Sequence, residues 1–388
     1  MTVHSSFAAR RLRVALVAAC TVALAGCDAA TSDNAAVTLE PAPAEHNLAG
    51  VCPDEVVVQL QWQPQSDMAG VIGLLGPGYT VDTERKSVTG PLAFDGKDTG
   101  VDLTLRAGGP AIGFQSVTSV MYTDETIHLG LVHGDQLIAA SAAQRVVGLT
   151  PLLRYSPAIL MWDPAAYPQV KTIADIGGTD AGVVVSKDQI FPQWLVAKGL
   201  LRQDQIDTSY DGAPARFVGD SRIVQQGFAN SEPYTYEHET PQWNKPVAYA
   251  MVKDAGYGVY ASNVTVRADR VDSLAPCLRA LVPMIQQTGK NYLAAPEPVN
   301  ETIVDWVSQD FSFTPYSAGE AAYSAKLLAD EAVIAPGADG VYGSYDLTEA
   351  QRIIDDLVPV LNAAGANLPT SLPADQLFTT RFISAEVR

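Results

Sequence analysis

The sequence predicts an α/β fold, because apolar runs typical of strands alternate with helical patterns along most of the chain. Beyond Glu55, apolar runs such as 56–60, 146–153 and 247–252 are separated by segments with helical periodicity. This alternation is typical of parallel sheets covered by helices. With 47% apolar residues among 388, the chain can bury a sizeable core and is long enough for two medium-sized domains.

The other expected elements complete this pattern, and no internal repeat is evident. Further strands are expected at 101–105, 127–132, 182–185, 206–210, 223–226 and 259–266. Helices are expected at 67–75, 136–143, 172–176, 192–200, 275–288, 301–308 and 348–363. The chain is therefore mostly helical after Val271.

The N-terminus has the layout of a secretory signal peptide. Three arginines among residues 10–13 precede the apolar stretch 14–24, which is too short to remain as a membrane-spanning helix. The sequence Leu-Ala-Gly-Cys then ends at Cys27 and resembles a bacterial lipobox. We therefore expect residues 1–26 to be a lipoprotein signal peptide. Acyl chains on Cys27 are then expected to anchor the protein to the extracytoplasmic face of the cell membrane. The alternative is a cleaved signal without lipid.

Residues 27–53 are expected to form a flexible tether between the lipid and the folded part. The stretch 28–50 is rich in Ala, Pro, Thr and Asn and has no sustained apolar period. The formal net charge of −18 excludes electrostatic attachment to nucleic acid or to anionic lipid. Membrane attachment is therefore expected through the lipid alone.

Two cysteines remain in the mature chain besides the lipidation site. They are Cys52 and Cys277, and an exported protein folds in an oxidising compartment. An even number of cysteines in that compartment predicts a disulfide between them. Two buried free thiols are the alternative.

Five stretches together resemble the type II periplasmic binding proteins, in the branch that binds thiamine-pyrimidine precursors, sulfonates, taurine and nitrate. They are LQWQPQ at 60–65, LGLVHGDQ at 129–136, SPAIL at 156–160, QGFANSEPY at 226–234 and LPADQLFTT at 372–380. The resemblance covers most of the mature chain and rests on the order and spacing of these stretches.

This resemblance implies a two-lobed fold with two crossover hinge strands. Lobe 1 is expected at 54–154 plus 264–388 and lobe 2 at 155–263, with hinges at 154–157 and 257–261. It also implies a monomeric solute-binding protein of an ABC importer, with a small-molecule ligand and a membrane permease as partners.

In open α/β sheets, ligands bind beyond the carboxyl ends of the strands, so residues at those positions are the candidates. Trp62 follows the first strand with Gln61, and its indole can stack on a ligand or pack in the core. His133 follows another strand, and Asp135 next to it is expected to cap a helix. Gln115 precedes a further expected helix, for which Ser116 is an equally plausible cap.

The second lobe and the hinge supply the other candidates. Trp194 lies in a helical pattern that also suits the core, and the hinge contributes Tyr155, Ser156 and Tyr257. Asn230 and Glu232 follow a strand, and Pro233 favours an extended Glu232 whose carboxylate can accept N–H groups of an aminopyrimidine. A solvated turn is the alternative role for Glu232.

These side chains favour a flat neutral or cationic nitrogen heterocycle, such as a thiamine pyrimidine precursor. An unpaired Glu232 in the cleft would repel a sulfonate, taurine or nitrate, unless Arg154 or Arg222 pairs with it or with the ligand. These anions and a riboflavin-like molecule are the alternative ligands on the same scaffold.

The sequence contains none of the common catalytic motifs. There is no P-loop, no Gly-x-Ser-x-Gly motif and no pair of histidines at metal-binding spacing. We therefore expect no enzyme, no cofactor and no metal site. The alternative is an extracytoplasmic enzyme that converts a pyrimidine on this fold.

Overall fold

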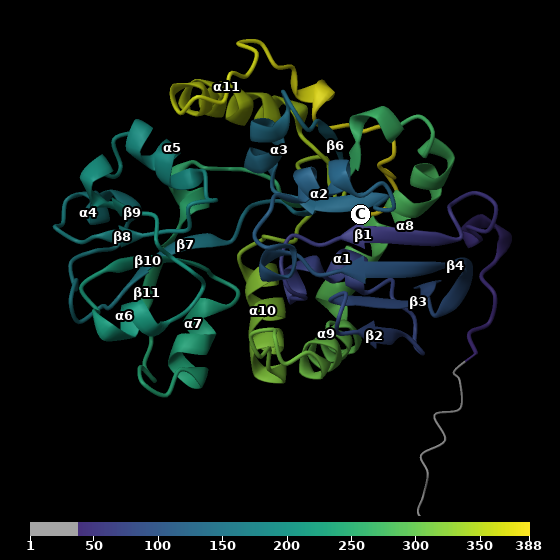
Figure 1. Cartoon of the computed structure of the whole chain (residues 1–388), viewed down its shortest axis with the longest axis horizontal. Coiled ribbons are helices and arrows are strands. Elements are labelled where there is room, and N and C mark those ends of the chain that lie inside the picture. The colour runs from purple at the N-terminus through teal and green to yellow at the C-terminus, as the bar shows by residue number, and fades with distance from the viewer. Residues whose placement is uncertain (1–37) are drawn as a thin grey trace, which may run out of the picture. The chain divides into compact units, whose positions relative to one another are not determined.

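Two separate β-sheets organise residues 38–388, the part of the chain that the computed structural model describes (Figure 1). The expected signal peptide and the expected lipidation site at Cys27 lie outside the described residues. We call the part built on the larger sheet, 38–153 and 261–388, lobe 1. The part built on the smaller sheet, 158–255, is lobe 2.

The sheet of lobe 1 has seven strands in the order β2-β3-β4-β1-β5-β12-β6. The central strand β1 pairs in parallel with β4 and β5, and all other pairs are antiparallel. The strands are β1 (Glu55–Gln59), β2 (Thr80–Asp82), β3 (Ser87–Phe94), β4 (Lys97–Arg106), β5 (Leu129–Val132), β6 (Val146–Leu153) and β12 (Ala261–Arg267).

The sheet of lobe 2 has five strands in the order β11-β7-β10-β8-β9. Strand β8 pairs in parallel with β9 and β10, whereas β7 runs antiparallel to β10 and β11. The strands are β7 (Ala158–Trp162), β8 (Val183–Val184), β9 (Ile206–Asp207), β10 (Val224–Phe228) and β11 (Ala248–Met251). Both sheets are therefore mixed, and the expectation of parallel sheets holds only for β4-β1-β5 in lobe 1 and for β10-β8-β9 in lobe 2.

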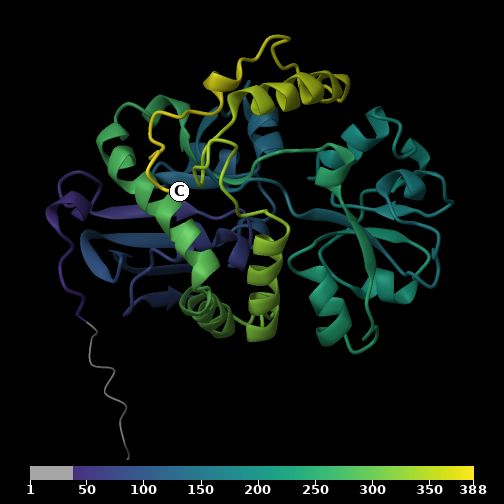
Figure 2. The ribbon, with the colours of Figure 1, turned by 180° about the vertical axis from the view of Figure 1, so that it is seen from behind.

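Helices cover both sheets, and the longest ones belong to lobe 1. The view from behind shows α8 and α10 in front of the larger sheet (Figure 2). The helices are α1 (Ala69–Ile72), α2 (Val117–Thr123), α3 (Gly134–Ala140), α4 (Ile173–Gly177), α5 (Phe191–Ala197), α6 (Ala215–Gly219), α7 (Glu232–Tyr234), α8 (Ala275–Ala294), α9 (Glu297–Gln309), α10 (Ala318–Asp330) and α11 (Leu347–Ala363).

Short helical turns complete the fold. They are η1 (Ala44–His46), η2 (Ser66–Met68), η3 (Gly109–Ile112), η4 (Gln203–Gln205), η5 (Thr235–Glu239), η6 (Val252–Ala255), η7 (Ala268–Arg270) and η8 (Ala374–Gln376). Within residues 38–388, no helix combines the length and the apolar character that crossing a membrane requires.

The periodicity of the sequence located most elements but missed several. Strands β2 and β3 and helices α6, α7 and α10 were not expected, and β7 was quoted only as part of the family resemblance. Strand β3 contains Gly90 and Pro91, which weaken a strand pattern, yet it is held by pairing with β4 on one side and β2 on the other.

Two short connections join the lobes and lie side by side. Residues 154–157 lead from β6 to β7, and residues 256–260 lead from η6 back to β12. The backbone N–H of Ser156 donates to the carbonyl of Val259 at 3.2 Å, which links the two connections.

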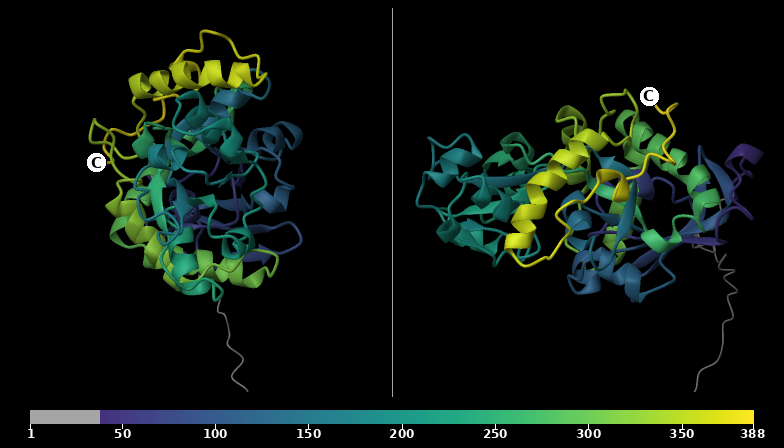
Figure 3. Two further views of the ribbon diagram at one scale, coloured as in Figure 1. Left: turned by 90° about the vertical axis from the view of Figure 1, so that its left-hand side faces the viewer. Right: turned by 90° about the horizontal axis from the view of Figure 1, so that it is seen from above.

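Two helices of lobe 1 also reach lobe 2. Viewed from above, α11 lies across the boundary between the lobes (Figure 3), and its Asp356 pairs with Lys198 beyond α5 at 3.0 Å. On α10, Ser324 accepts from the side-chain amide of Asn230 at 3.1 Å. The two lobes therefore meet on both sides of the connections.

The segment 38–53, expected to be part of the tether, is instead packed on lobe 1. Leu48 is fully buried, and the N–H of Ala42 donates to the carbonyl of Asp98 in β4 at 2.6 Å. The predicted disulfide is present and joins Cys52 to Cys277 of α8. A buried leucine and a covalent link outweigh a composition that is otherwise typical of a linker.

Candidate functional site

A narrow crevice between the lobes is lined by residues of both lobes and of both connections. Its volume of about 10 Å³ holds roughly one water molecule. The lining residues are His133, Asp135, Gln136, Ser156, Ala158, Gln189, Phe191, Phe228, Tyr257 and Val259. We refer to this space as the crevice.

The lobe 1 wall of the crevice is supported by a buried polar network at the carboxyl ends of β1 and β5. The Gln61 amide donates to the hydroxyl of Ser262 and to the carboxylate of Asp67, both at 3.0 Å. The N–H of Ser262 in turn donates to Nδ1 of His133 at 3.2 Å. Burial lowers the pKa of His133, so this ring is neutral and accepts through Nδ1. The sequence-predicted Gln61 and His133 are thus joined through Ser262.

The Asp67 carboxylate is the most constrained group of this network. Its burial raises its pKa to about 6. One carboxylate oxygen, Oδ1, is buried and has no hydrogen-bond partner. The sequence analysis missed Asp67 and Ser262, and the only available signal was their position just after β1 and at the start of β12.

A hydrogen bond crosses the crevice from the hinge to α3. The Tyr257 hydroxyl donates to Oδ2 of Asp135 at 2.7 Å, and Asp135 Oδ1 accepts from the N–H of Gln136. Asp135 was expected to cap α3, but it lies in the first turn and His133 occupies the cap position. Its carboxylate instead holds Tyr257, whose pKa is raised first by burial and then by this carboxylate.

Glu232 lies behind the lobe 2 wall and is bonded within its own lobe. Its Oε2 accepts from the N–H of Phe228 at 2.7 Å, and the Tyr210 hydroxyl donates to Oε1 at 3.4 Å. Burial raises the pKa of Glu232. The extended shape expected before Pro233 is not observed, because Glu232 begins α7 and a proline is tolerated in the first turn of a helix.

The remaining predicted residues do not line the crevice. Trp194 packs edge-on against Tyr257, with ring centroids 5.2 Å apart, and so supports the wall from behind. The ring of Trp62 is tilted against the ring of Phe114, with centroids 6.0 Å apart. Gln115, which follows Phe114 in the sequence, is exposed. Asn230 faces α10, and Tyr155 lies under the guanidinium of Arg154. Of the predicted residues, His133, Ser156 and Tyr257 line the crevice.

Neither arginine proposed as a partner for Glu232 contacts it. Arg154 donates to the carbonyl of Pro336 at 2.7 Å, and Arg222 pairs with Asp220 at 3.1 Å. No lysine or arginine is among the residues that line the crevice. The crevice therefore presents a carboxylate and aromatic rings without a compensating cation.

The residues missed by the sequence analysis are mainly apolar or amide side chains at element ends. Phe228 ends β10, Phe191 begins α5, and Gln136 and Gln189 add amide groups. Their location beyond strands was visible in the sequence, but nothing in it distinguished them from core or surface residues.

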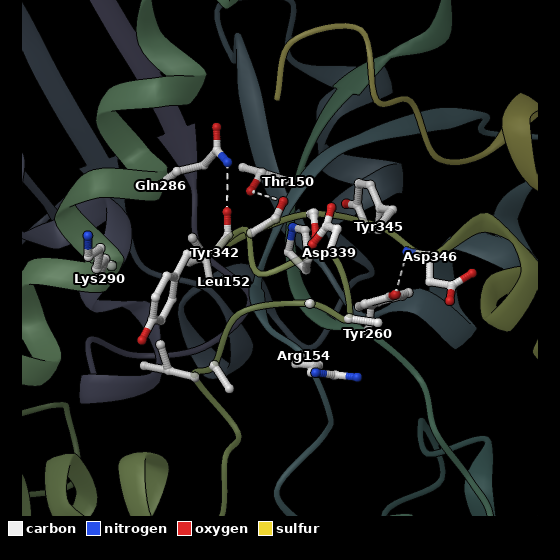
Figure 4. Close-up of a pocket in the computed structure, with 18 of the residues that line it drawn as sticks. Thr150, Leu152, Arg154, Tyr260, Gln286, Lys290, Asp339, Tyr342, Tyr345 and Asp346 are labelled. Atoms are coloured by element: carbon white, nitrogen blue, oxygen red, sulfur yellow. Dashed lines mark hydrogen bonds between the residues drawn. The ribbon is translucent and has the colours of Figure 1, made fainter. Parts of the chain in front are cut away.

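A second, larger cavity lies behind the hinge on the lobe 1 side (Figure 4). Its volume is about 450 Å³. It is lined by β6 and the first connection, by Tyr260 of the second connection, by α8, by the loop 334–346 between α10 and α11, and by Leu347 of α11. We refer to it as the hinge cavity.

Residues 38–388 contain no group of three or more His, Cys, Asp and Glu side chains placed to hold a metal ion. Neither the crevice nor the hinge cavity therefore offers a metal-ligand set among the described residues.

Solved structures with this fold are found, although no protein-family model and no curated protein sequence matches the chain. An ABC transporter structure from Parabacteroides distasonis is 8% identical, with a TM-score of 0.50, over 86% of this chain and 99% of that one. The alkanesulfonate-binding protein SsuA from Xanthomonas axonopodis pv. citri, bound to MOPS, is 11% identical, with a TM-score of 0.52, over 84% and 98%.

A protein from Bordetella bronchiseptica RB50 is similar to the same degree, at 13% identity and a TM-score of 0.52 over 85% of this chain and 96% of that one. At these identities the likeness establishes the fold. The chain has the two-lobed α/β fold of periplasmic binding proteins, as predicted from the sequence.

Proposed function

We propose that this chain is the solute-binding component of an ABC importer. The observation that carries the proposal is the crevice, which both lobes and both connections line in a fold shared with an ABC transporter protein and a sulfonate-binding protein. In such a protein the lobes close on a small ligand and present the closed form to a membrane permease. The moving parts would be 54–154 plus 264–388 and 155–263.

Entry of a ligand requires the lobes to separate, because the crevice holds only about one water molecule. The two parallel connections can absorb the rotation, since a few residues at element ends suffice for a hinge. The Tyr257–Asp135, Asn230–Ser324 and Lys198–Asp356 contacts join parts that such a rotation would move relative to each other. Closure is then favoured when a ligand adds contacts that only the closed form allows.

The crevice favours a planar neutral or cationic heterocycle, such as a thiamine pyrimidine precursor. Phe191, Phe228 and Tyr257 offer aromatic faces or edges, and Asp135 offers a carboxylate whose bond to the Tyr257 hydroxyl a ligand N–H would replace. A sulfonate would meet Asp135 with no lining cation to balance it. Asp135 takes the acceptor role that the sequence analysis gave to Glu232.

An alkanesulfonate is the second candidate ligand, and the observation that favours it is the similarity to SsuA. A cationic group would then have to enter the open crevice from outside its present lining. Exposed Lys187, in the loop after β8, is the nearest such candidate along the chain to the lining residue Gln189.

We also propose that the protein is exported and anchored through lipid on Cys27. The lipobox-like sequence and the disulfide, which is typical of an oxidising compartment, support this. A Cys27→Ala variant should be recovered in the soluble extracytoplasmic fraction, whereas the unaltered protein stays with the membrane. Retention of the variant in the membrane would contradict the anchor.

Isothermal titration of the purified protein against an aminopyrimidine, riboflavin, taurine, an alkanesulfonate and nitrate tests the ligand class. We expect saturable binding of the aminopyrimidine and about tenfold weaker binding by Asp135→Asn, because a charge-assisted hydrogen bond is lost. The control Asp339→Asn, in the hinge cavity, should bind like the unaltered protein.

Each other outcome has a defined meaning. Tight binding of a sulfonate alone would replace the ligand class and keep the receptor. Conversion of the heterocycle by the isolated protein would favour the enzyme alternative and overturn the proposal.

A further inference from the structure

The hinge cavity has the size of a ligand site but plays no part in the proposed function. Pockets that bind small molecules typically measure about 300–1,000 Å³, and this one measures about 450 Å³. Its apolar walls are made by Pro151, Leu152, Ile285, Ile334, Ala335 and Leu347.

The acceptor groups around the hinge cavity are already bonded within the protein. Asp339 accepts from the N–H of Val341 and the hydroxyl of Ser344. Asp346 caps α11 by accepting from the N–H groups of Thr348 and Glu349. Neither carboxylate is therefore free to receive a cationic ligand without disturbing its loop.

The polar groups that lack partners are donors instead. The ammonium of partly buried Lys290 forms no ion pair or hydrogen bond with any described residue, and neither does the Tyr342 hydroxyl. The guanidinium of Arg154 uses one N–H for Pro336 and leaves the others unbonded. In Figure 4, Lys290 stands on α8 and Arg154 lies on the opposite side of the Tyr342 ring.

The lack of an ion pair is not unusual by itself in this protein, because other basic side chains of residues 38–388, such as exposed Lys97 and Arg279, form none either. What distinguishes Lys290 and Arg154 is that both line one cavity whose carboxylates are already bonded. The hinge cavity therefore offers unbonded donors rather than free acceptors, which suits an anionic group.

We propose that the hinge cavity is a second small-molecule site, which takes an organic anion with an apolar body and a carboxylate, sulfonate or phosphate group. The anionic group is held by Lys290, and the body lies against the apolar walls, which reach toward Arg154 on the other side of the Tyr342 ring. A molecule bound there contacts both connections, through Arg154 of the first and Tyr260 of the second. The site is separate from the crevice, with which it shares no lining residue.

The fluorescent probe anilinonaphthalene sulfonate combines an aromatic body with a sulfonate and is suited to test this site. We expect one saturable site for each chain of the purified protein. Lys290→Met should weaken binding about tenfold or more, because a charge-assisted contact is lost while the apolar stem is kept. Lys290→Arg should retain binding. Phenylnaphthylamine, which has the same body without the sulfonate, should be insensitive to Lys290→Met.

The matched control is Lys171→Met, the same substitution at an exposed lysine of lobe 2 that lines neither the crevice nor the hinge cavity. It should leave the affinity for the sulfonate probe unchanged. Equal affinity of Lys290→Met and the unaltered protein would overturn the proposal. Equal weakening by both lysine variants, or no saturable binding of the probe, would overturn it as well. Circular dichroism of each variant verifies that the fold is intact.

Discussion

The crevice and the hinge cavity lie on different sides of the same pair of connections and differ in almost every physical property. The crevice has a volume of about 10 Å³ and contains a hydrogen bond that joins its two walls, Tyr257 to Asp135. The hinge cavity has a volume of about 450 Å³, and its lining includes the unbonded donors of Lys290, Arg154 and Tyr342. Volume alone would therefore point to a different space from the one in which the proposed function places the ligand.

The difference teaches that position in the fold and accessible volume carry separate information. In the proposed function the crevice lies between lobes that move, so its volume in one conformation says little about its ligand. The hinge cavity is enclosed mainly by elements of lobe 1, and its volume is less dependent on closure. Three predictions test this contrast.

Removal of the disulfide should have the largest effect on stability. Cys277 lies on α8, which supplies Ile285, Gln286, Gly289 and Lys290 to the hinge cavity and no residue to the crevice. A Cys52→Ala, Cys277→Ala double variant should lose about 2–4 kcal/mol of unfolding free energy in urea titrations. Because 225 residues separate the two cysteines in the sequence, we expect the loss of unfolding free energy to lie toward the upper end of this range.

Dithiothreitol should destabilise the unaltered protein by a similar amount and leave the double variant unchanged. A disulfide-free variant as stable as the unaltered protein would show that α8 is held by packing alone.

The second prediction concerns the contact that flanks the crevice between α10 and lobe 2. Glu320 is 2% exposed and accepts from the Ser231 hydroxyl at 2.5 Å. Burial, together with repulsion by Glu239 and Glu232, raises its pKa from an ordinary 4.5 to about 8. The folded protein thus holds this proton more tightly than the unfolded chain does.

The stability that this proton contributes is complete below the unfolded pKa and is lost as pH rises toward 8. Between pH 5 and pH 8 we expect the free energy of unfolding to fall by about 2 kcal/mol. This fall is smaller than the limiting slope of about 1.4 kcal/mol per pH unit would give, because opening of the interface admits water. Glu320→Gln should flatten this dependence, measured by urea unfolding at several pH values. Glu301→Gln, at an exposed position of α9, serves as the control and should not.

An unchanged pH dependence in the Glu320→Gln variant would mean that the carboxyl group is solvated in solution. The lobes would then be apart at α10 for most of the time.

The third prediction, with the smallest expected effect, compares one tyrosine of the crevice with one tyrosine of the hinge cavity. Tyr257→Phe removes the hydroxyl that donates to buried Asp135 and should cost about 1.5 kcal/mol of unfolding free energy. Tyr342→Phe removes a hydroxyl without a partner and should change the same quantity by less than about 0.5 kcal/mol. Equal effects of the two substitutions would remove the distinction between a bonded crevice and an unbonded cavity.

The fold could be predicted from the sequence because its signals are local. Strand β6 was predicted at its observed bounds, and α11 was predicted to within one residue, since their apolar patterns are continuous. The disulfide was predicted from the oxidising compartment and the even number of remaining cysteines rather than from any local pattern. The hairpin β2–β3 could not be predicted, because its strands depend on pairing with β4 rather than on their own apolar periodicity.

The candidate site could be predicted only in part, since bonding partners distant in the sequence decide where a side chain points. His133, Ser156 and Tyr257 lie beyond strands or in the connections, where the rule for open sheets places ligands. Asn230 is turned away by Ser324, and Glu232 by the backbone of Phe228. The hinge cavity combines four distant segments of the chain, and no pattern in the sequence indicates that they meet.

Small-angle X-ray scattering of the purified protein, with and without the ligand that binds best in the titration, tests the central claim most directly. The account predicts a radius of gyration for the free protein that exceeds the value calculated from the structure and falls toward it at saturating ligand. The same radius in both samples, at a ligand concentration that calorimetry shows to be saturating, would contradict an opening and closing crevice.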